Sequence, residues 1–213
     1  MGAGGARGSG KGYDLPFPME QSIPNVFVMG GPNGAGKSTA APFILRDVLS
    51  VAEFVNADVI ARGLSGFDPD RAAMQAGRTM LTRLRELASE RRDFAFETTL
   101  ASRSFAPWLS SLRATGYRVH VVYVWVPNPS ISVSRVRRRV ELEGHHVPPD
   151  VVRRRYRRGL ANLEELYRPL ADHWRIYDNS TNEGPRLVVY GGPASGEGVL
   201  DAELWERIQQ SAR

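Results

Sequence analysis

The sequence predicts an α/β domain in which a parallel sheet is covered by helices on both faces. Short apolar segments of strand length alternate with segments whose apolar residues recur at the 3.6-residue helical period. Several of the short segments are apolar throughout, which is typical of strands buried on both faces of a parallel sheet. The chain has 213 residues, is 42% hydrophobic and shows no internal repeat or linker. We therefore expect a single domain over residues 23–213, preceded by a flexible Gly-rich tail over residues 1–22.

The first half of the chain contains three expected strands and the helices that connect them. The strands are expected at NVFVMGG, EFVNADVI and DFAFETT, which are residues 25–31, 53–60 and 93–99. A helix is expected over residues 37–50 because the apolar residues between Ala41 and Val48 fall on one side. A second helix is expected to begin at Asp68, since an acidic N-cap followed by a proline in the first turn is a helix start signal.

The second half adds three expected strands and four expected helices. The strands are RVHVVYVWV, WRIYDNS and RLVVYGG, which are residues 118–126, 174–180 and 186–192. The first of these is the most apolar and is therefore expected at the centre of the sheet. The helices are expected at residues 104–114, 129–142 and 149–167 and from Asp201, which is expected to cap the last one. The helices over 129–142 and 149–167 are rich in arginine, are joined by EGHHVPP and have the form of a lid.

The composition excludes several classes of protein. The chain has no cysteine, so disulfides, thiolate metal sites and cysteine nucleophiles are absent. No apolar segment approaches the roughly 18 residues that a membrane-spanning helix needs. The N-terminus lacks the basic and then apolar order of a signal peptide. A cytoplasmic protein that makes no membrane contact is expected.

Two stretches match the G-x-x-x-x-G-K pattern of a phosphate-binding loop, GARGSGKG at 5–12 and GPNGAGKS at 31–38. Only the second lies between a predicted strand and a predicted helix and has a hydroxyl directly after its lysine. Past the tail, Lys37 is the only lysine in a chain that otherwise uses arginine, so a compact ammonium is expected to be required there. ATP is the expected ligand, with Mg²⁺ bound through Ser38. The expected nucleotide-binding residues are Gly31, Pro32, Asn33, Gly34, Ala35, Gly36, Lys37, Ser38 and Thr39.

Two carboxylates, Asp58 and Glu97, lie at the ends of predicted strands and would share the rim of a parallel sheet with the phosphate loop. The chain lacks the N/T-K-x-D signal of guanine-binding proteins, and no aspartate directly follows its most apolar strand. Carboxylates at two neighbouring strand ends suit a small-molecule kinase. One can accept the proton of an acceptor hydroxyl while the other orients substrate or metal-bound water. A turn or helix cap is the alternative interpretation of Asp58, and a solvated strand end is that of Glu97.

Arginines concentrate in the two helices that flank EGHHVPP. Three interpretations compete for them. They can form solvated helix faces with glutamate partners, or a surface that neutralises the phosphates of a nucleic acid. They can also belong to a lid that stabilises the charge on a transferring phosphoryl group. The arginines concerned are Arg135, Arg137, Arg138, Arg139, Arg153, Arg154, Arg155, Arg157 and Arg158.

Seven segments resemble the zeta toxin family of P-loop kinases in collinear order over residues 25–180. They are GGPNGAGKST, NADVIARGL, AGRTML, FAFETTLASRS, RVRRRVELEGHHVP, RRRYRRGLANL and YDNS. The most specific parts are ETTLA and the two arginine-rich segments, because the phosphate loop alone is common to many families. The resemblance implies a P-loop kinase-like fold and an ATP-dependent phosphotransferase. Its implied acceptor is the 3′-hydroxyl of the amino sugar in UDP-N-acetylglucosamine.

The resemblance also implies roles for individual residues. Lys37 and Ser38 hold phosphates and Mg²⁺, Asp58 is the general base, Glu97 and Thr98 contact the substrate, and Arg139 and Arg155 are catalytic lid residues. Arg154 or Arg158 is the alternative to Arg155. The chain departs from the family at Glu143, which replaces the first glycine of the lid loop, and it is shorter than plasmid-type members. An antitoxin is a further partner that the resemblance suggests. A nucleoside or polynucleotide kinase and a non-catalytic ATP-binding module are the alternative functions.

Overall fold

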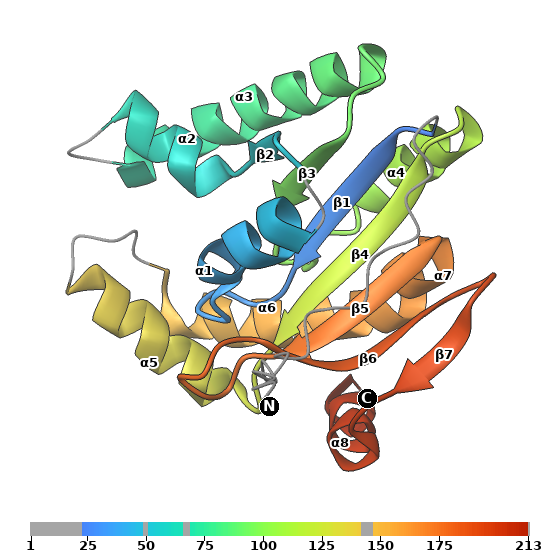
Figure 1. Ribbon diagram of the computed structural model, residues 1–213. Helices are drawn as coiled ribbons and strands as arrows, with labels where there is room; N and C mark the ends of the chain where they lie inside the picture. The colour runs from blue at the N-terminus through green and yellow to red at the C-terminus, as the bar shows by residue number, and fades with distance from the viewer. Residues whose placement is uncertain (1–22, 49–50, 66–68, 142–146, 213) are drawn as a thin grey trace, which may run out of the picture.

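The computed structural model describes residues 23–48, 51–65, 69–141 and 147–212, and it forms one seven-stranded sheet with helices around it (Figure 1). The strand order is β2-β3-β1-β4-β5-β6-β7, so the apolar strand β4 lies at the centre, as predicted. The strands are β1 (Asn25–Gly30), β2 (Phe54–Val55), β3 (Phe94–Glu97), β4 (Arg118–Trp125), β5 (His173–Asp178), β6 (Arg186–Gly192) and β7 (Gly196–Val199). The first five are parallel to one another, which confirms the predicted α/β fold with a mostly parallel sheet.

The last two strands depart from the prediction because they run antiparallel to their neighbours. Only residues 179–185 connect β5 to β6, whereas a parallel connection needs a crossover of about a dozen residues or more. The short connection therefore forces the antiparallel direction. The edge strand β7 was not predicted, because its sequence GEGV has neither apolar alternation nor β-branched content beyond Val199.

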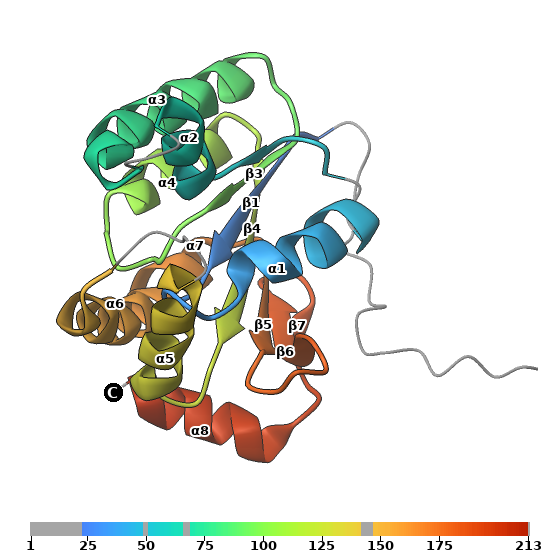
Figure 2. The ribbon, with the colours of Figure 1, turned by 90° about the vertical axis from the view of Figure 1, so that its left-hand side faces the viewer.

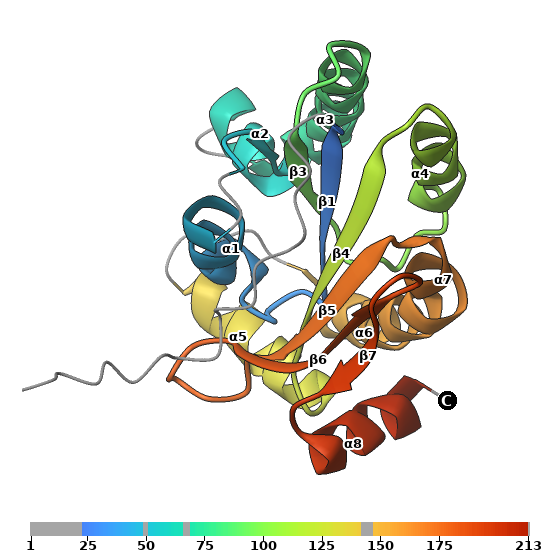
Figure 3. The same cartoon turned by 45° about the vertical axis from the view of Figure 1, so that its right-hand side comes forward.

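Helices cover both faces of the sheet, as expected. They are α1 (Lys37–Ala41), α2 (Ala57–Leu64), α3 (Pro69–Ser89), α4 (Phe105–Ala114), α5 (Pro129–Val140), α6 (Pro149–Asn162), α7 (Arg168–Leu170) and α8 (Ala202–Ala212), with π-helical turns at Pro42–Val48 and Leu163–Tyr167. Helix α1 and the turns after it pack on one face, and α3, α4, α6 and α8 pack on the other. Figures 2 and 3 show this division from two further sides, with α1 on one side of the sheet and α4, α6 and α7 on the opposite side in Figure 3.

The prediction of a strand over residues 53–60 is wrong after Val55, where the chain turns into helix α2. The Asn56 side chain causes the change, because its Oδ1 accepts hydrogen bonds from the backbone N–H groups of Asp58, at 2.8 Å, and Val59, at 3.3 Å. These two bonds cap the helix and satisfy amides that would otherwise lack partners. Asp58 therefore lies in the first turn of a helix rather than at the end of a strand.

Three other boundaries refine the prediction. The helix expected over 37–50 is α-helical only to Ala41, because Pro42 has no N–H to continue the hydrogen-bond ladder. The helix expected over 149–167 likewise changes to π-helical turns at Leu163. Asp201 caps the final helix as expected, since its Oδ1 accepts a bond of 2.9 Å from the Leu204 N–H. The tail over 1–22, the Asp68 cap and lid-loop residues 142–146 lie outside the described residues. In the described part of the chain, no helix combines the length and apolar character needed to cross a membrane.

Candidate active site

The carboxyl ends of the five parallel strands meet at one edge of the sheet, and a cavity of about 530 Å³ opens there. Its walls come from the phosphate loop and α1, from α2, from α5 and from the segment that connects β5 to β6. The lining residues with polar or charged side chains are Asn33, Lys37, Ser38, Thr39, Asp58, Glu97, Arg135, Arg138, Arg139, Asn179, Thr181 and Asn182. Ligands of open α/β folds bind at this edge of the sheet. In this chain the same edge carries the polar and charged side chains that line the cavity.

The phosphate loop follows β1 and depends on glycine at two close approaches. A β-carbon on Gly31 would lie 2.4 Å from the Val124 carbonyl oxygen, and one on Gly34 would lie 2.5 Å from that of Ser132. Both glycines also have positive φ angles, of 141° and 76°, which side chains of L-residues rarely adopt. Their positions explain why the loop carries glycine where it crosses the ends of β4 and the start of α5.

Lys37 lies in the middle of the site and is only 5% exposed. Its Nζ donates a hydrogen bond of 3.0 Å to the Pro32 carbonyl oxygen and lies 3.5 Å from Glu97 Oε1. Burial lowers the pKa of the Lys37 ammonium below its usual value, and the carboxylates of Glu97 and then Asp58 partly oppose that shift. The ammonium is thus held between loop and carboxylate at a place where water is largely excluded.

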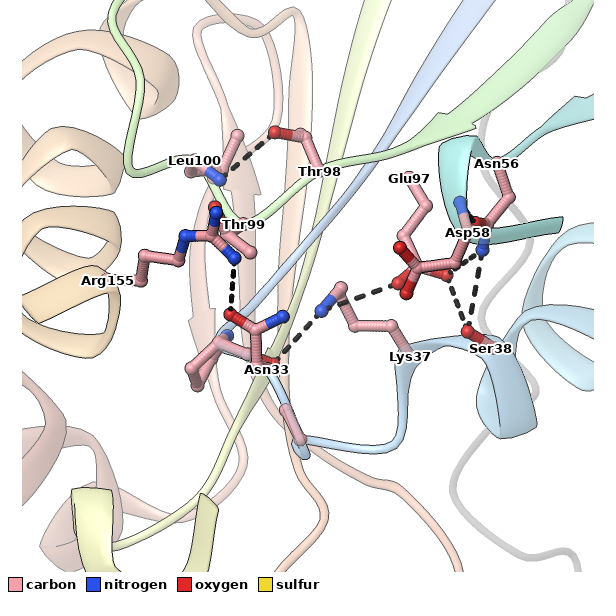
Figure 4. Close-up of polar contacts among 12 residues, drawn as sticks. Asn33, Lys37, Ser38, Asn56, Asp58, Glu97, Thr98, Thr99, Leu100 and Arg155 are labelled. Carbon is pink, nitrogen blue, oxygen red and sulfur yellow. Dashed lines mark hydrogen bonds and ion pairs between the residues drawn. The ribbon is translucent and has the colours of Figure 1, made fainter. Parts of the chain in front are cut away.

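Glu97 connects β3 to the phosphate loop through a short hydrogen-bond network (Figure 4). Its Oε2 accepts bonds of 2.8 Å from Ser38 Oγ and 2.7 Å from Asn56 Nδ2. Asn56 therefore has two roles, since its oxygen caps α2 while its amide nitrogen contacts the carboxylate. Sequence reasoning missed Asn56. The signal available was its place as the residue that directly follows β2 on the same rim.

Asp58 and Arg139 face one another across the cavity from α2 and α5. The distance between Arg139 Nη1 and Asp58 Oδ2 is 3.8 Å, and the two side chains are 40% and 44% exposed. Figure 4 shows the Asp58 carboxylate beside Glu97, on the side of the phosphate loop where Lys37 and Ser38 lie. The structure therefore brings Asp58 to the cavity even though the predicted strand end does not exist.

Two further predicted site residues, Thr98 and Arg155, are absent from the described residues that line the cavity, as are Gly31, Pro32 and Ala35 of the phosphate loop. Arg155 lies on the other side of the phosphate loop, where its Nη1 donates a hydrogen bond of 3.2 Å to Asn33 Oδ1 (Figure 4). Thr98 Oγ1 accepts a bond of 3.2 Å from the Leu100 N–H. The structure thus separates Arg139, which lines the cavity, from Arg155, which contacts the tip of the loop.

A second group that sequence reasoning missed lies after β5. Asn179 Nδ2 donates a hydrogen bond of 2.7 Å to the Ala35 carbonyl oxygen of the phosphate loop. Arg135 in turn donates bonds of 2.8 Å and 3.2 Å to the carbonyl oxygens of Asn179 and Ser180. The rule that ligands bind outside the carboxyl ends of parallel strands could have identified Asn179, because it directly follows Asp178 at the end of β5.

Glu97→Gln should make ATP binding more sensitive to alkaline pH. The Glu97 carboxylate raises the pKa of Lys37 against the larger effect of burial, so its removal should lower that pKa further. Lys37 loses its proton and its positive charge above its pKa. In the variant the affinity for ATP should therefore begin to fall at a lower pH than in wild type. The measurement is calorimetry without divalent cation. The control is Glu90→Gln, which removes the same charge from an exposed side chain that pairs with Arg92. Identical alkaline profiles for wild type and Glu97→Gln would contradict the expectation.

Comparison with protein families shows which family the chain belongs to. The model of the family described as AAA domain matches residues 26–166, which include the phosphate loop, Asp58, Glu97 and both arginine-rich helices. The chain belongs to this family of P-loop domains. An uncharacterized protein of Haemophilus influenzae is 29% identical over 126 residues, which are 59% of this chain and 88% of that protein.

Solved structures show the same fold at low identity. The AvrRxo1-ORF1:AvrRxo1-ORF2 complex with sulphate ions matches with a TM-score of 0.71 and 19% identity, over 90% of this chain and 65% of the matched chain. The chain thus spans less than two thirds of that relative. The same complex with ATP matches equally well, with a TM-score of 0.71 and 18% identity over the same shares. The PezAT chromosomal toxin–antitoxin system of Streptococcus pneumoniae matches with a TM-score of 0.61 and 17% identity, over 91% of this chain and 86% of the other. The fold is therefore P-loop kinase-like.

Proposed function

We propose that this AAA-domain family member is an ATP-dependent small-molecule kinase of the zeta toxin type. In this proposal it transfers the γ-phosphoryl group of ATP to a hydroxyl of a sugar nucleotide, the 3′-hydroxyl of UDP-N-acetylglucosamine. The observation that carries the proposal is one juxtaposition at the rim of the sheet. A buried lysine and a hydroxyl of the phosphate loop lie beside two carboxylates, Asp58 in the first turn of α2 and Glu97 at the end of β3.

On the donor side, the phosphate loop from Gly31 to Thr39 binds the phosphates of ATP and Lys37 lies against the β- and γ-phosphate oxygens. Ser38 Oγ and Glu97 Oε2, which are 2.8 Å apart, would hold Mg²⁺, directly or through water. A hydroxyl and a carboxylate fit this ion because hard oxygen ligands are those it prefers. Bound there, Mg²⁺ would neutralise charge on the phosphate oxygens. Glu97 would thereby have a metal role in addition to the substrate contact that the resemblance implies.

On the acceptor side, Asp58 accepts the proton of the attacking hydroxyl. The acceptor oxygen forms a bond to the γ-phosphorus, the bond from that phosphorus to the bridging oxygen breaks, and ADP leaves with the electron pair. Arg139 lies 3.8 Å from Asp58 and is placed to stabilise charge on the transferring group. Arg155 acts from the tip of the loop through Asn33 and does not line the donor cavity. Thr98 contributes to the acceptor side next to Glu97.

The choice of the zeta toxin type rests on the sequence segments that resemble that family and is supported by the toxin–antitoxin system among the structures of like fold. The structural likeness at 17% identity concerns the fold alone, so the sugar-nucleotide acceptor is supported by the motifs ETTLA and RRRY rather than by the neighbour. On the same grounds we propose an antitoxin protein as a partner. A protein antagonist would be expected to act by covering the cavity or displacing Arg139 from Asp58.

A second candidate, a polynucleotide kinase, is favoured by one specific observation. Six exposed arginines of α5 and α6 make no ion pair with any residue in the described part of the chain. They are Arg137, Arg138, Arg153, Arg154, Arg157 and Arg158. Such a surface would neutralise backbone phosphates, and binding through it would weaken steeply as salt is raised.

An acceptor screen tests the proposed function. The purified protein is incubated with ATP, Mg²⁺ and a panel of UDP-sugars, nucleosides and oligonucleotides, and the products are analysed by mass spectrometry. We expect UDP-N-acetylglucosamine to gain the mass of one phosphate, with fragmentation that places it on the 3′-oxygen of the sugar. Phosphorylation of oligonucleotides alone would establish the second candidate instead. A panel without any phosphorylated product would contradict the kinase proposal.

A further inference from the structure

The loop that follows β3 holds a leucine in an unusual backbone conformation. Leu100 has a φ of 55°, and in the described ranges Arg91 is the only other non-glycine residue with a positive φ. The conformation brings the β-carbon of an L-residue close to its own backbone, so it persists only where the surroundings hold it. Leu100 is fully buried, and its side chain packs so close to the start of the phosphate loop that a β-carbon on Gly30 would lie 2.6 Å from Leu100 Cδ1.

One stripe of α6 and the turns after it fixes this loop through three backbone carbonyl groups. Asn162 Nδ2 donates a hydrogen bond of 2.8 Å to the Leu100 carbonyl oxygen, and the Tyr167 hydroxyl donates one of 2.7 Å to the Ser102 carbonyl oxygen. Gly159 allows the closest approach, because a β-carbon there would lie 2.4 Å from the Thr99 carbonyl oxygen. The loop is therefore held at successive points by a single helical surface.

That surface is itself anchored in the core. Leu160 and Leu163 are fully buried against the sheet, and Asn162 between them is 7% exposed. About two turns before Asn162, the same helix carries Arg155, which contacts Asn33 of the phosphate loop. Helix α6 thus contacts both the loop after β3 and the phosphate loop. Figure 4 shows Arg155 between Thr99 and Asn33.

We infer that Asn162 is a positioning residue for the acceptor side of the site. By donating to the Leu100 carbonyl it holds the loop in its left-handed turn, and the turn sets Glu97 and Thr98 against the phosphate loop. An apolar side chain of the same size would fill the space but leave a buried carbonyl oxygen without a donor, so the loop would shift to find one. The inference rests on the proposed function for its kinetic consequence, whereas its structural consequence is independent of any substrate.

The test uses Asn162→Leu, with Gly159→Ala as a second variant that disturbs the same loop from another contact. In both we expect kcat/KM for UDP-N-acetylglucosamine to fall by about ten- to hundredfold, since a displacement of about 1 Å has an effect of this size. The Kd for ATP should change much less. Hydrogen exchange should accelerate at the amides of Leu100 and Ala101, which are bonded to the threonine hydroxyls of the loop.

The matched control is Asn25→Leu, which removes a buried amide that bonds to the Ile23 carbonyl oxygen and to His120 at the opposite end of the sheet. It should lower the melting temperature and leave both acceptor kinetics and exchange at residues 98–101 as in wild type. The inference is overturned if Asn162→Leu and Gly159→Ala match this control in exchange at the loop. If wild type phosphorylates no acceptor, the proposed function fails, and the exchange measurement still decides the role of Asn162.

Discussion

Lys37→Ala should lower kcat/KM for phosphoryl transfer by about a thousandfold, since a single preorganised group that stabilises transition-state charge contributes on this scale. Lys37 is 5% exposed and is the only lysine among the described residues, so within them no second lysine ammonium can take its place. The fold should survive. Burial disfavours the charged form of Lys37, as the direction of its pKa shift indicates, so removing the charge relieves an unfavourable desolvation. Steady-state kinetics and thermal unfolding of the same preparation check both expectations.

Lys37→Arg is the informative control, because it keeps the positive charge. Nζ sits 3.0 Å from the Pro32 carbonyl oxygen and 3.5 Å from Glu97, and a planar guanidinium is wider than the ammonium that fits between them. We expect Lys37→Arg to stay within about tenfold of Lys37→Ala, since the two side chains are not interchangeable at a site of this shape. Wild-type activity in either variant would remove Lys37 from the donor site.

Asp58→Asn should reduce kcat by about a hundred- to ten-thousandfold, the range that positioned acid–base groups contribute. The substitution keeps the shape of the side chain but removes its negative charge and its ability to accept a proton. Because Asn56 caps α2 through the backbone amides of Asp58 and Val59, the helix should remain in place. ATP affinity should change little, since the phosphate loop is untouched. The measurements are single-turnover transfer and calorimetric binding of ATP.

The control for Asp58→Asn is Asp150→Asn, which also removes a carboxylate from the first turn of a helix. Asp150 is exposed at the start of α6 and is not among the described residues that line the cavity. Its loss should leave turnover unchanged. Normal turnover in Asp58→Asn, or an equal loss in both variants, would contradict the role of Asp58 as the base.

The phosphate loop could be predicted from the sequence because its features are local. A strand, glycines at fixed spacing, a lysine and a hydroxyl occur within one short stretch, and the structure places Lys37 and Ser38 together at the cavity. Asp58 is a different case. Its place on the rim was predicted from a strand end that does not exist, and the cap formed by Asn56 moves it into α2 while leaving it at the same edge of the sheet. The position of Asp58 at the rim of the sheet was predictable, whereas the helix that carries it was not.

The contacts that shape the rest of the site depend on residues far apart in the chain. Asn179 bonds to Ala35, and Arg155 bonds to Asn33, although 144 and 122 positions separate the partners along the chain. Neither pairing follows from periodicity or from a motif, because each depends on the order of the strands in the sheet. The two arginine-rich helices illustrate the same limit. Their sequences look alike, yet α5 places Arg139 in the cavity whereas α6 contributes Arg155 at the loop tip.

The direct test of the central claim is the fate of the γ-phosphoryl group. The protein is incubated with Mg²⁺ and ATP that carries a label in this group, with UDP-N-acetylglucosamine present or absent, and the label is followed into sugar nucleotide and inorganic phosphate. We predict that it passes to the sugar nucleotide in wild type, that little reaches water, and that Lys37→Ala and Asp58→Asn lose the transfer. Label found only in inorganic phosphate, or retained in ATP with every acceptor of the screen, would show that this site does not function as a phosphotransferase.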